Sequence, residues 1–283
     1  MHDLVHLEPV DYLVLGHISV DLTPDGPRLG GTASYAAMTA RALGLRPGIV
    51  TSLSSATDTQ PLAGIPILST PSEHSTTFEN RTVAGIRTQL LQHRAGELAI
   101  EDVPAAWRQA RIVHLGPIAN EIASGITRYF SASLVGLTPQ GWMRLWDEDG
   151  RVHASPWLDP DEDLQQAGAV VLSMEDVDGD LEAVERLAQK ARVLCLTEAA
   201  AGSVVYWNGD RRRFRAPAVT EVDATGAGDI FAAAFFTRLL STRDPWEAAR
   251  FATHLAARSV TRPGLEGIPT SEEIEDCLVE VLS

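Results

Sequence analysis

A glycine-rich turn that runs into a long apolar helix constrains this chain more than any other stretch. Residues 222–236 read VDATGAGDIFAAAFF. Two glycines two positions apart weaken a helix, whereas the alanine-rich run after them predicts a buried helix that reaches about Leu240. The amides of Gly226, Ala227 and Gly228 would then be unpaired at the helix start, where the helix dipole is positive. The turn therefore predicts a site for an anion such as a phosphate.

Asp229 closes this turn and has two interpretations. A carboxylate at that position repels a bound phosphate, so its presence needs a reason. It can cap the N-terminus of the helix. Alternatively, it can be a general base that takes a proton from a hydroxyl while the neighbouring amides hold a phosphoryl group. The pattern alone leaves both interpretations open.

The turn resembles the signature of the ribokinase-like (PfkB) carbohydrate kinases, which also ends in Gly-Ala-Gly-Asp. Residues 30–36, GGTASYA, resemble their second signature, a glycine pair near the N-terminus. The order and spacing of the two signatures agree with the family over nearly the whole chain. The resemblance implies that Asp229 is the catalytic base and that the amides of Gly226, Ala227 and Gly228 form an anion hole. It further implies ATP as phosphoryl donor, with Mg²⁺ bridging its phosphates.

Composition narrows the class of protein. The chain has 283 residues, 45% of them hydrophobic and 22% charged, as in a globular protein, and we predict one kinase domain over residues 1–283. The net charge of −15 argues against a nucleic-acid partner. No apolar run reaches membrane-spanning length and the N-terminus has no signal-peptide pattern, so we expect no membrane partner and a cytoplasmic location. Cys195 and Cys277 lie in apolar segments and are predicted to be inert core residues.

The sequence contains a single lysine, Lys190. It lies in a stretch with no phosphate-binding motif, so a P-loop NTPase and a protein-kinase fold are both excluded. A phosphoryl transferase of this composition has to use backbone amides, arginine and a metal ion.

Apolar strand-like runs alternate with helical stretches along the chain, which predicts an α/β fold with a parallel sheet and helices on both faces. The resemblance implies a ribokinase-like three-layer sandwich. It adds a small β lid from roughly residues 17–30 and 73–95, which includes a predicted hairpin turning at Ala84 and Gly85. Such lids also form dimers in some members of the family, so a homodimer through the lid is possible.

The acceptor is expected beyond the carboxyl ends of the strands, where ligands bind in open α/β sheets. Ser19 and Asp21 follow the first strand and are predicted to hydrogen-bond a polyol, although Asp21 could be only a turn or cap residue. The resemblance places Gly30 and Gly31 beside the acceptor. Ser34 is a further candidate, or a residue of the first helical turn. His17 is interpreted as an ordinary polar loop residue, and His114 as a core histidine.

Gln140 and Arg144 follow a central strand and point toward the same edge. Many sugar kinases of the family carry Asp and Asn where this chain has Thr138 and Gln140, which puts an ordinary sugar acceptor in doubt. Several local features look more like the myo-inositol kinases of the family. A cyclitol needs carboxylate, amide and guanidinium partners, which Asp21, Gln140 and Arg144 supply.

The donor side carries weaker matches to the family. Thr197 and Gly202 agree with its nucleotide loop, whereas Ala199 departs from it. Thr225, Gly226 and Gly228 are expected beside the ATP phosphates. His254 lies where some members place a polar residue near adenine, or it is an ordinary half-buried helix histidine. Asp176 is a candidate for the metal role.

The sequence therefore predicts an ATP-dependent kinase that phosphorylates a hydroxyl of a sugar or of a cyclic polyol such as myo-inositol. A ribokinase, a fructokinase and an adenosine or nucleoside kinase of the same fold are alternatives. A catalytically idle ligand-binding sensor is an alternative of another class.

Overall fold

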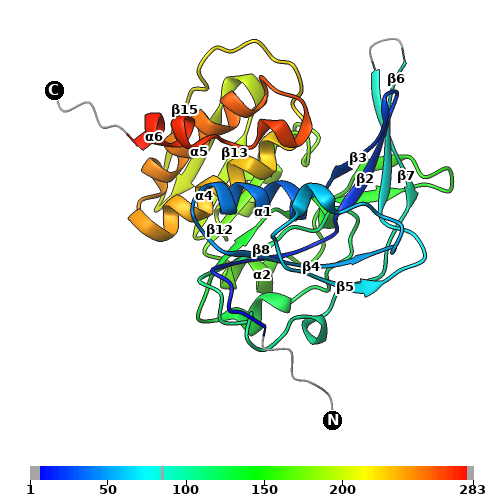
Figure 1. Ribbon diagram of the computed structural model, residues 1–283. Helices are drawn as coiled ribbons and strands as arrows, with labels where there is room; N and C mark the ends of the chain where they lie inside the picture. The colour runs from blue at the N-terminus through cyan, green and yellow to red at the C-terminus, as the bar shows by residue number, and fades with distance from the viewer. Residues whose placement is uncertain (1–6, 84–85, 279–283) are drawn as a thin grey trace.

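A nine-stranded sheet forms the centre of the computed structural model, which describes residues 7–83 and 86–278 (Figure 1). The strand order is β15-β14-β13-β12-β9-β8-β1-β4-β5. The seven parallel strands are β1 (Tyr12–Leu15), β4 (Pro47–Leu53), β5 (Ile67–Pro71), β8 (Ile112–Leu115), β9 (Leu134–Leu137), β12 (Ala169–Ser173) and β13 (Val193–Thr197). Two antiparallel strands, β14 (Ser203–Trp207) and β15 (Asp210–Phe214), complete one edge. The prediction of a mostly parallel sheet is confirmed.

Both faces of this sheet are buried at its centre, because successive residues of the central strands enter two different apolar clusters. Tyr12 and Val14 join one cluster, whereas Leu13 and Leu15 join the other. Strands buried on both faces read as continuous apolar runs, which is how they appear in the sequence.

Helices cover both faces, as predicted. The first face carries α1 (Thr32–Ala42), α4 (Ala227–Thr242) and α5 (Pro245–Ser259), and α6 (Ser271–Leu278) packs on α5. The second face carries α2 (Asp161–Gln166) and α3 (Leu181–Ala188). Short 3₁₀ helices lie between these elements: η1 (Gln60–Leu62), η2 (Ile100–Asp102), η3 (Ile126–Phe130), η4 (Pro139–Met143), η5 (Ala199–Ala201) and η6 (Gly264–Gly267). No helix in the described ranges is long and apolar enough to cross a membrane.

The expected alternation of strands with helices fails in the middle of the chain. The connection from β8 to β9 contains η3 and no α-helix, and the connection from β9 to β12 begins with η4 and a small hairpin of β10 (Arg144–Trp146) and β11 (Val152–Ala154). The cysteine prediction holds, because Cys195 and Cys277 are both buried and burial raises the pKa of each thiol.

A second, four-stranded sheet stands at one side of the molecule (Figure 1). Its order is β3-β2-β6-β7, with β2 (Ser19–Thr23), β3 (Gly26–Gly30), β6 (Thr77–Val83) and β7 (Ile86–His93). These strands match the predicted small β element, although the turn at Ala84 and Gly85 lies outside the described residues. Phe78 and Leu91 of this small sheet pack against Ile118 and Ala119 of the body.

The interpretation of His17 as an ordinary loop residue is wrong. Its side chain is fully buried where the small sheet joins the body. Nε2 lies 2.8 Å from the Gly96 carbonyl oxygen and Nδ1 lies 2.7 Å from the Thr76 hydroxyl. A carbonyl can only accept, so Nε2 donates to Gly96, and a second hydrogen bond joins Nδ1 to the Thr76 hydroxyl. His17 therefore connects three of the chain segments that enter or leave the small sheet.

Candidate active site

The glycine turn before α4 has the geometry that a close backbone approach needs. Gly226 is the N-cap residue with φ of 79°, and a Cβ there would lie 2.3 Å from the ring of Tyr35. Only glycine fits that position. Gly228 differs, because its φ is not in the left-handed region and a Cβ there would meet nothing within 4 Å. Open space therefore lies in front of Gly228.

The amides of this turn are not all unpaired, as the sequence had suggested. The Ala227 amide donates to the Ala224 carbonyl at 3.2 Å, which closes the turn. In the described part of the chain, no protein group accepts from the amides of Gly226 and Gly228. The predicted anion hole is thereby reduced to these two amides and the positive end of α4.

Asp229 is the third residue of α4, so the cap interpretation is wrong: Gly226 occupies the N-cap position. The carboxylate instead accepts a hydrogen bond from the Thr32 hydroxyl, with 2.6 Å between Oγ1 and Oδ1. Burial raises the pKa of Asp229 to about 6, against the lowering effects of the Thr32 hydrogen bond and of Arg144. Asp176 and Asp21 raise this pKa further. An acid with this pKa is suited to gain and lose a proton near neutral pH.

Two of the predicted acceptor residues, Asp21 and Arg144, influence the pKa of Asp229, and the third, Gln140, contacts Asp176. Asp21 lies in β2, Gln140 follows β9 in η4, and Arg144 begins β10. The Arg144 Nη1 atom donates to the Ile118 carbonyl at 3.3 Å. Burial lowers the pKa of Arg144, whereas Asp176 and Asp229 raise it. The carboxyl ends of β1, β9 and β12 thus bring opposite charges together at one edge of the sheet.

The glycine pair makes room for Asp21 rather than for a ligand alone. A Cβ at Gly30 would lie 2.2 Å from the Asp21 carboxylate, and Ser19 donates to that carboxylate at 3.2 Å. Gly31 has φ of 84° and a Cβ there would meet the His17 carbonyl at 2.5 Å. Ser34 is fully buried and its hydroxyl donates to the Gly30 carbonyl at 2.7 Å. It therefore secures the start of α1 and does not reach the surface of the site.

The predicted donor residues lie farther along the same edge. Thr197 ends β13, and the exposed Thr225 uses its amide to bond the Asp223 carboxylate at 2.9 Å. Gly202 has φ of 97°, and a Cβ there would meet the Phe214 carbonyl at 2.0 Å, so the β14–β15 hairpin itself requires glycine. His254 is half-buried in α5, and burial lowers its pKa.

The site's carboxylates could hold a metal only together with a phosphate ligand. Asp176 accepts from the Ser173 amide at 2.7 Å, and the Gln140 amide lies 3.4 Å from its other oxygen. Within the described residues, no group of three or more His, Cys, Asp or Glu side chains could hold a metal ion. This donor set fits Mg²⁺, which keeps several waters and binds through one or two carboxylates plus substrate phosphates.

Two buried polar residues beside the site were not predicted from the sequence. Thr32 directly follows the glycine pair, and this position was a sign that it lies near the site. Its hydrogen-bond partner Asp229 could not be predicted, because it lies 197 positions away. Glu121 is 1% exposed and accepts the amides of His17, Ile118 and Ala119. It joins the loops after β1 and β8. Nothing in the sequence distinguishes it from an exposed loop glutamate.

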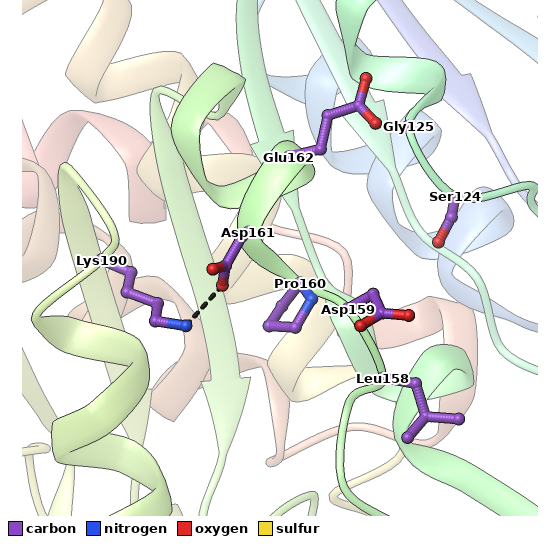
Figure 2. A pocket seen from close by; sticks show the side chains of 8 residues that line it. All are labelled: Ser124, Gly125, Leu158, Asp159, Pro160, Asp161, Glu162 and Lys190. Atoms are coloured by element: carbon purple, nitrogen blue, oxygen red, sulfur yellow. Dashed lines mark hydrogen bonds and ion pairs between the residues drawn. The ribbon is translucent and has the colours of Figure 1, made fainter.

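A hollow of about 550 Å³ lies elsewhere in the molecule (Figure 2). It lies beside the start of α2 and the connection between α3 and β13, at the amino ends of strands, whereas Asp229 lies at the carboxyl ends. Its lining residues are Ser124, Gly125, Leu158, Asp159, Pro160, Asp161, Glu162 and Lys190. Lys190 is paired with Asp161. This hollow is therefore separate from the candidate site around Asp229.

Comparisons with known proteins agree with the fold and the turn. The family model described as pfkB family carbohydrate kinase matches residues 166–271, which include the turn and α4. A fructokinase from Escherichia coli is 30% identical over 201 residues, which are 63% of this chain and 64% of that protein. The chain thus matches less than two thirds of that relative.

Solved structures resemble the chain over nearly its whole length. A pyrophosphate-dependent kinase in the ribokinase family, complexed with a pyrophosphate analog and myo-inositol, has a TM-score of 0.76 at 20% identity and covers 94% of this chain and 100% of its own. Arabidopsis thaliana ribokinase complexed with ribose and ATP has a TM-score of 0.75 at 17% identity and covers 96% and 99%. At these low sequence identities, the structural likeness shows a shared fold. The chain has the ribokinase-like fold of these solved kinases, and its residues 166–271 match the pfkB carbohydrate kinase family model.

Proposed function

We propose that the chain is a kinase that transfers the γ-phosphoryl group of ATP to a hydroxyl of a small polyol. The observation that carries this proposal is one juxtaposition at the start of α4. A carboxylate with a raised pKa, Asp229, lies next to two amides without an acceptor in the described chain, those of Gly226 and Gly228. Proton transfer and phosphate binding are the two tasks that such a reaction sets the protein.

In the proposed reaction, ionised Asp229 accepts the proton of the acceptor hydroxyl. The hydroxyl oxygen then forms a bond to the γ-phosphorus while the bond to the β-phosphate oxygen breaks, and ADP leaves with that electron pair. The Gly226 and Gly228 amides stabilise the negative charge on the transferred group. Mg²⁺ bound with the donor would neutralise phosphate charge, with Asp176 as the candidate protein ligand.

The acceptor that we propose is a cyclic polyol such as myo-inositol. Asp21, Gln140 and Arg144 offer a carboxylate, an amide and a guanidinium to a ring that carries only hydroxyls. The small sheet would act as a lid on a single domain and exclude water from the reaction. The myo-inositol complex of the pyrophosphate-dependent relative supports this acceptor and makes pyrophosphate the alternative donor to test.

The proposal also covers the cellular location and the oligomeric state of the protein. A cytoplasmic location would supply ATP and keep Cys195 and Cys277 reduced. A homodimer would form through the small sheet, where Leu22 is 37% exposed.

The base is tested by Asp229→Asn, which keeps the size of the side chain and its ability to accept from Thr32. We expect kcat to fall at least roughly 10²-fold with donor affinity little changed, since a general base contributes about that much. Steady-state kinetics with a coupled ADP assay give both constants. Asp244→Asn is the matched control, because Asp244 caps α5 and asparagine caps equally well. An Asp229→Asn enzyme with near wild-type turnover would contradict the assignment.

The acceptor is tested with myo-inositol, ribose, fructose and adenosine, each with ATP and with pyrophosphate. We expect the highest kcat/KM for the cyclitol. Gln140→Ala should raise KM for the acceptor by about tenfold and leave the donor KM nearly unchanged, because a lost hydrogen bond leaves buried partners unpaired. Preference for ribose or adenosine would reject the cyclitol and keep the kinase. Ligand-induced thermal stabilisation without any turnover would instead support a sensor.

A further inference from the structure

We propose that Thr32 is a positioning residue for Asp229, holding the carboxylate in the orientation from which it accepts the acceptor proton. The inference rests on the proposed role of Asp229 as the base. It adds a residue from α1 to a site whose base lies on α4.

Thr32 is itself held firmly. It is 2% exposed and is the first residue of α1, directly after the left-handed Gly31. Its methyl group packs against Gly116, where a Cβ would lie only 2.4 Å from Thr32 Cγ2. A β-branched residue in a helix has few χ1 rotamers. With the methyl group fixed on Gly116, the hydroxyl is directed at Asp229.

The contact fixes one oxygen of the carboxylate and leaves the other for chemistry. Thr32 Oγ1 bonds Oδ1 of Asp229 at 2.6 Å, a short distance typical of a hydroxyl donating to a charged oxygen. Among the described residues, no group bonds Oδ2. The Tyr35 ring under Gly226 joins the same two helices one turn away from Thr32. The N-termini of α1 and α4 therefore meet at two contacts, Thr32 with Asp229 and Tyr35 with Gly226.

The hydrogen bond also sets the charge of Asp229. It is the largest effect that lowers the Asp229 pKa, against the desolvation that raises it. The other ionisable groups coupled to Asp229 are Asp21 in β2, Tyr12 in β1, Tyr35 in α1, Arg144 in β10 and Asp176 after β12. Removing only the Thr32 hydroxyl leaves all of them in place, so the pKa of Asp229 should rise.

The test compares Thr32→Val with wild type in the pH dependence of kcat/KM. Valine keeps the shape and the packing on Gly116 but cannot donate. We expect kcat at pH 7 to fall about tenfold, the factor that one hydrogen bond to a charged group supports, and the acid limb of kcat/KM to move to higher pH. Donor KM should be unchanged. Thr39→Val is the matched control, because Thr39 lies in the same helix and its buried hydroxyl has no partner in the described chain.

A second pair of variants tests the same inference if Thr32→Val fails to fold. Thr32→Ser and Thr32→Ala both lose the methyl group and differ only in the hydroxyl. We expect Ser to keep the wild-type acid limb and Ala to shift it. An unshifted limb in both Val and Ala would overturn the inference, even with lower activity, since that result would indicate packing alone. Asp229→Asn run in parallel separates the two hypotheses: if it stays active, the proposed base is wrong whatever the Thr32 variants do.

Discussion

Ala199 adopts a backbone conformation that suits glycine better. It has φ of 48° and is exposed at the start of η5, in the loop that we expect beside the nucleotide. An L-residue in the left-handed region costs about 1–2 kcal/mol. The ribokinase-like family often has glycine at this position, whereas this chain has alanine in the same left-handed conformation.

Ala199→Gly should therefore stabilise the protein. We expect the free energy of unfolding to rise by about 0.5–1 kcal/mol, because the relief of strain exceeds the entropy that glycine loses on folding. Urea denaturation followed by circular dichroism measures the change. Ala200→Gly, one residue later at ordinary φ, is the control and should destabilise. A lower stability for Ala199→Gly would contradict the strain.

Single residues were predictable from the sequence where their partners are local. The glycine turn and the helix after it follow from neighbours in the chain, and the structure gives Gly226 the positive φ that such a turn needs. His17 and Thr32 were not predictable in the same way. Their hydrogen bonds reach 79 and 197 positions along the chain. Only the folded sheet brings such residues together.

At the scale of elements, the start of α4 combines two glycines with different tasks. Gly226 is required by its left-handed φ and by the Tyr35 ring beneath it. Gly228 has room for a side chain, and that room is where the phosphoryl group would lie. The sequence predicted the bounds of α4 well, because its apolar run and flanking turn are local. It could not predict that the turn closes through the Ala227 amide.

The two glycines should fail differently when each is replaced by alanine. We expect Gly226→Ala to lower the free energy of unfolding by more than about 1 kcal/mol, because of the positive φ and the clash with Tyr35. Gly228→Ala should keep the stability and lower kcat/KM, because its methyl group occupies the anion site. Thermal unfolding and steady-state kinetics on both variants separate the effects. Equal behaviour of the two variants would contradict this division.

At the scale of the whole molecule, acidic groups dominate the field around the site. Asp176 and Asp229 both raise the pKa of Arg144, and Asp21 raises that of Asp229, in a chain with a net charge of −15. The layered sheet was predictable, since apolar runs in order define it. The closeness of these charged residues was predictable only in part, because the carboxyl ends of parallel strands lie at the same edge of the sheet. The strength of the interaction between these charges depends on how deeply they are buried, which the sequence does not show.

The raised pKa of Asp229 predicts the pH dependence of the reaction. A base must be deprotonated, so kcat/KM for the acceptor should decrease as pH falls through about 6, with a slope approaching tenfold per pH unit. An aspartate at its usual value of 3.8 would put this limb some two pH units lower. Rates measured from pH 5 to 8 in buffers of constant ionic strength give the limb. A flat profile down to pH 5 would contradict the raised pKa.

The same group should affect stability in the opposite direction. A carboxyl whose folded pKa lies above its unfolded value binds an extra proton on folding between the two values. Its contribution is favourable at low pH and is lost as pH rises through about 6. Asp229→Asn should therefore raise the melting temperature at pH 7.5 more than at pH 4.

The lone lysine gives the molecule one further property. Lys190 lies in the connection between α3 and β13, at the edge of the sheet opposite Asp229, and its side chain is half exposed beside Asp161 (Figure 2). An amine-directed reagent finds no other lysine in the sequence. A fluorophore or a surface tether attached there would leave the small sheet and the glycine turn untouched. Lys190 is thus the one lysine side chain to which a reporter of ligand binding can be attached, on the far side of the fold from the glycine turn.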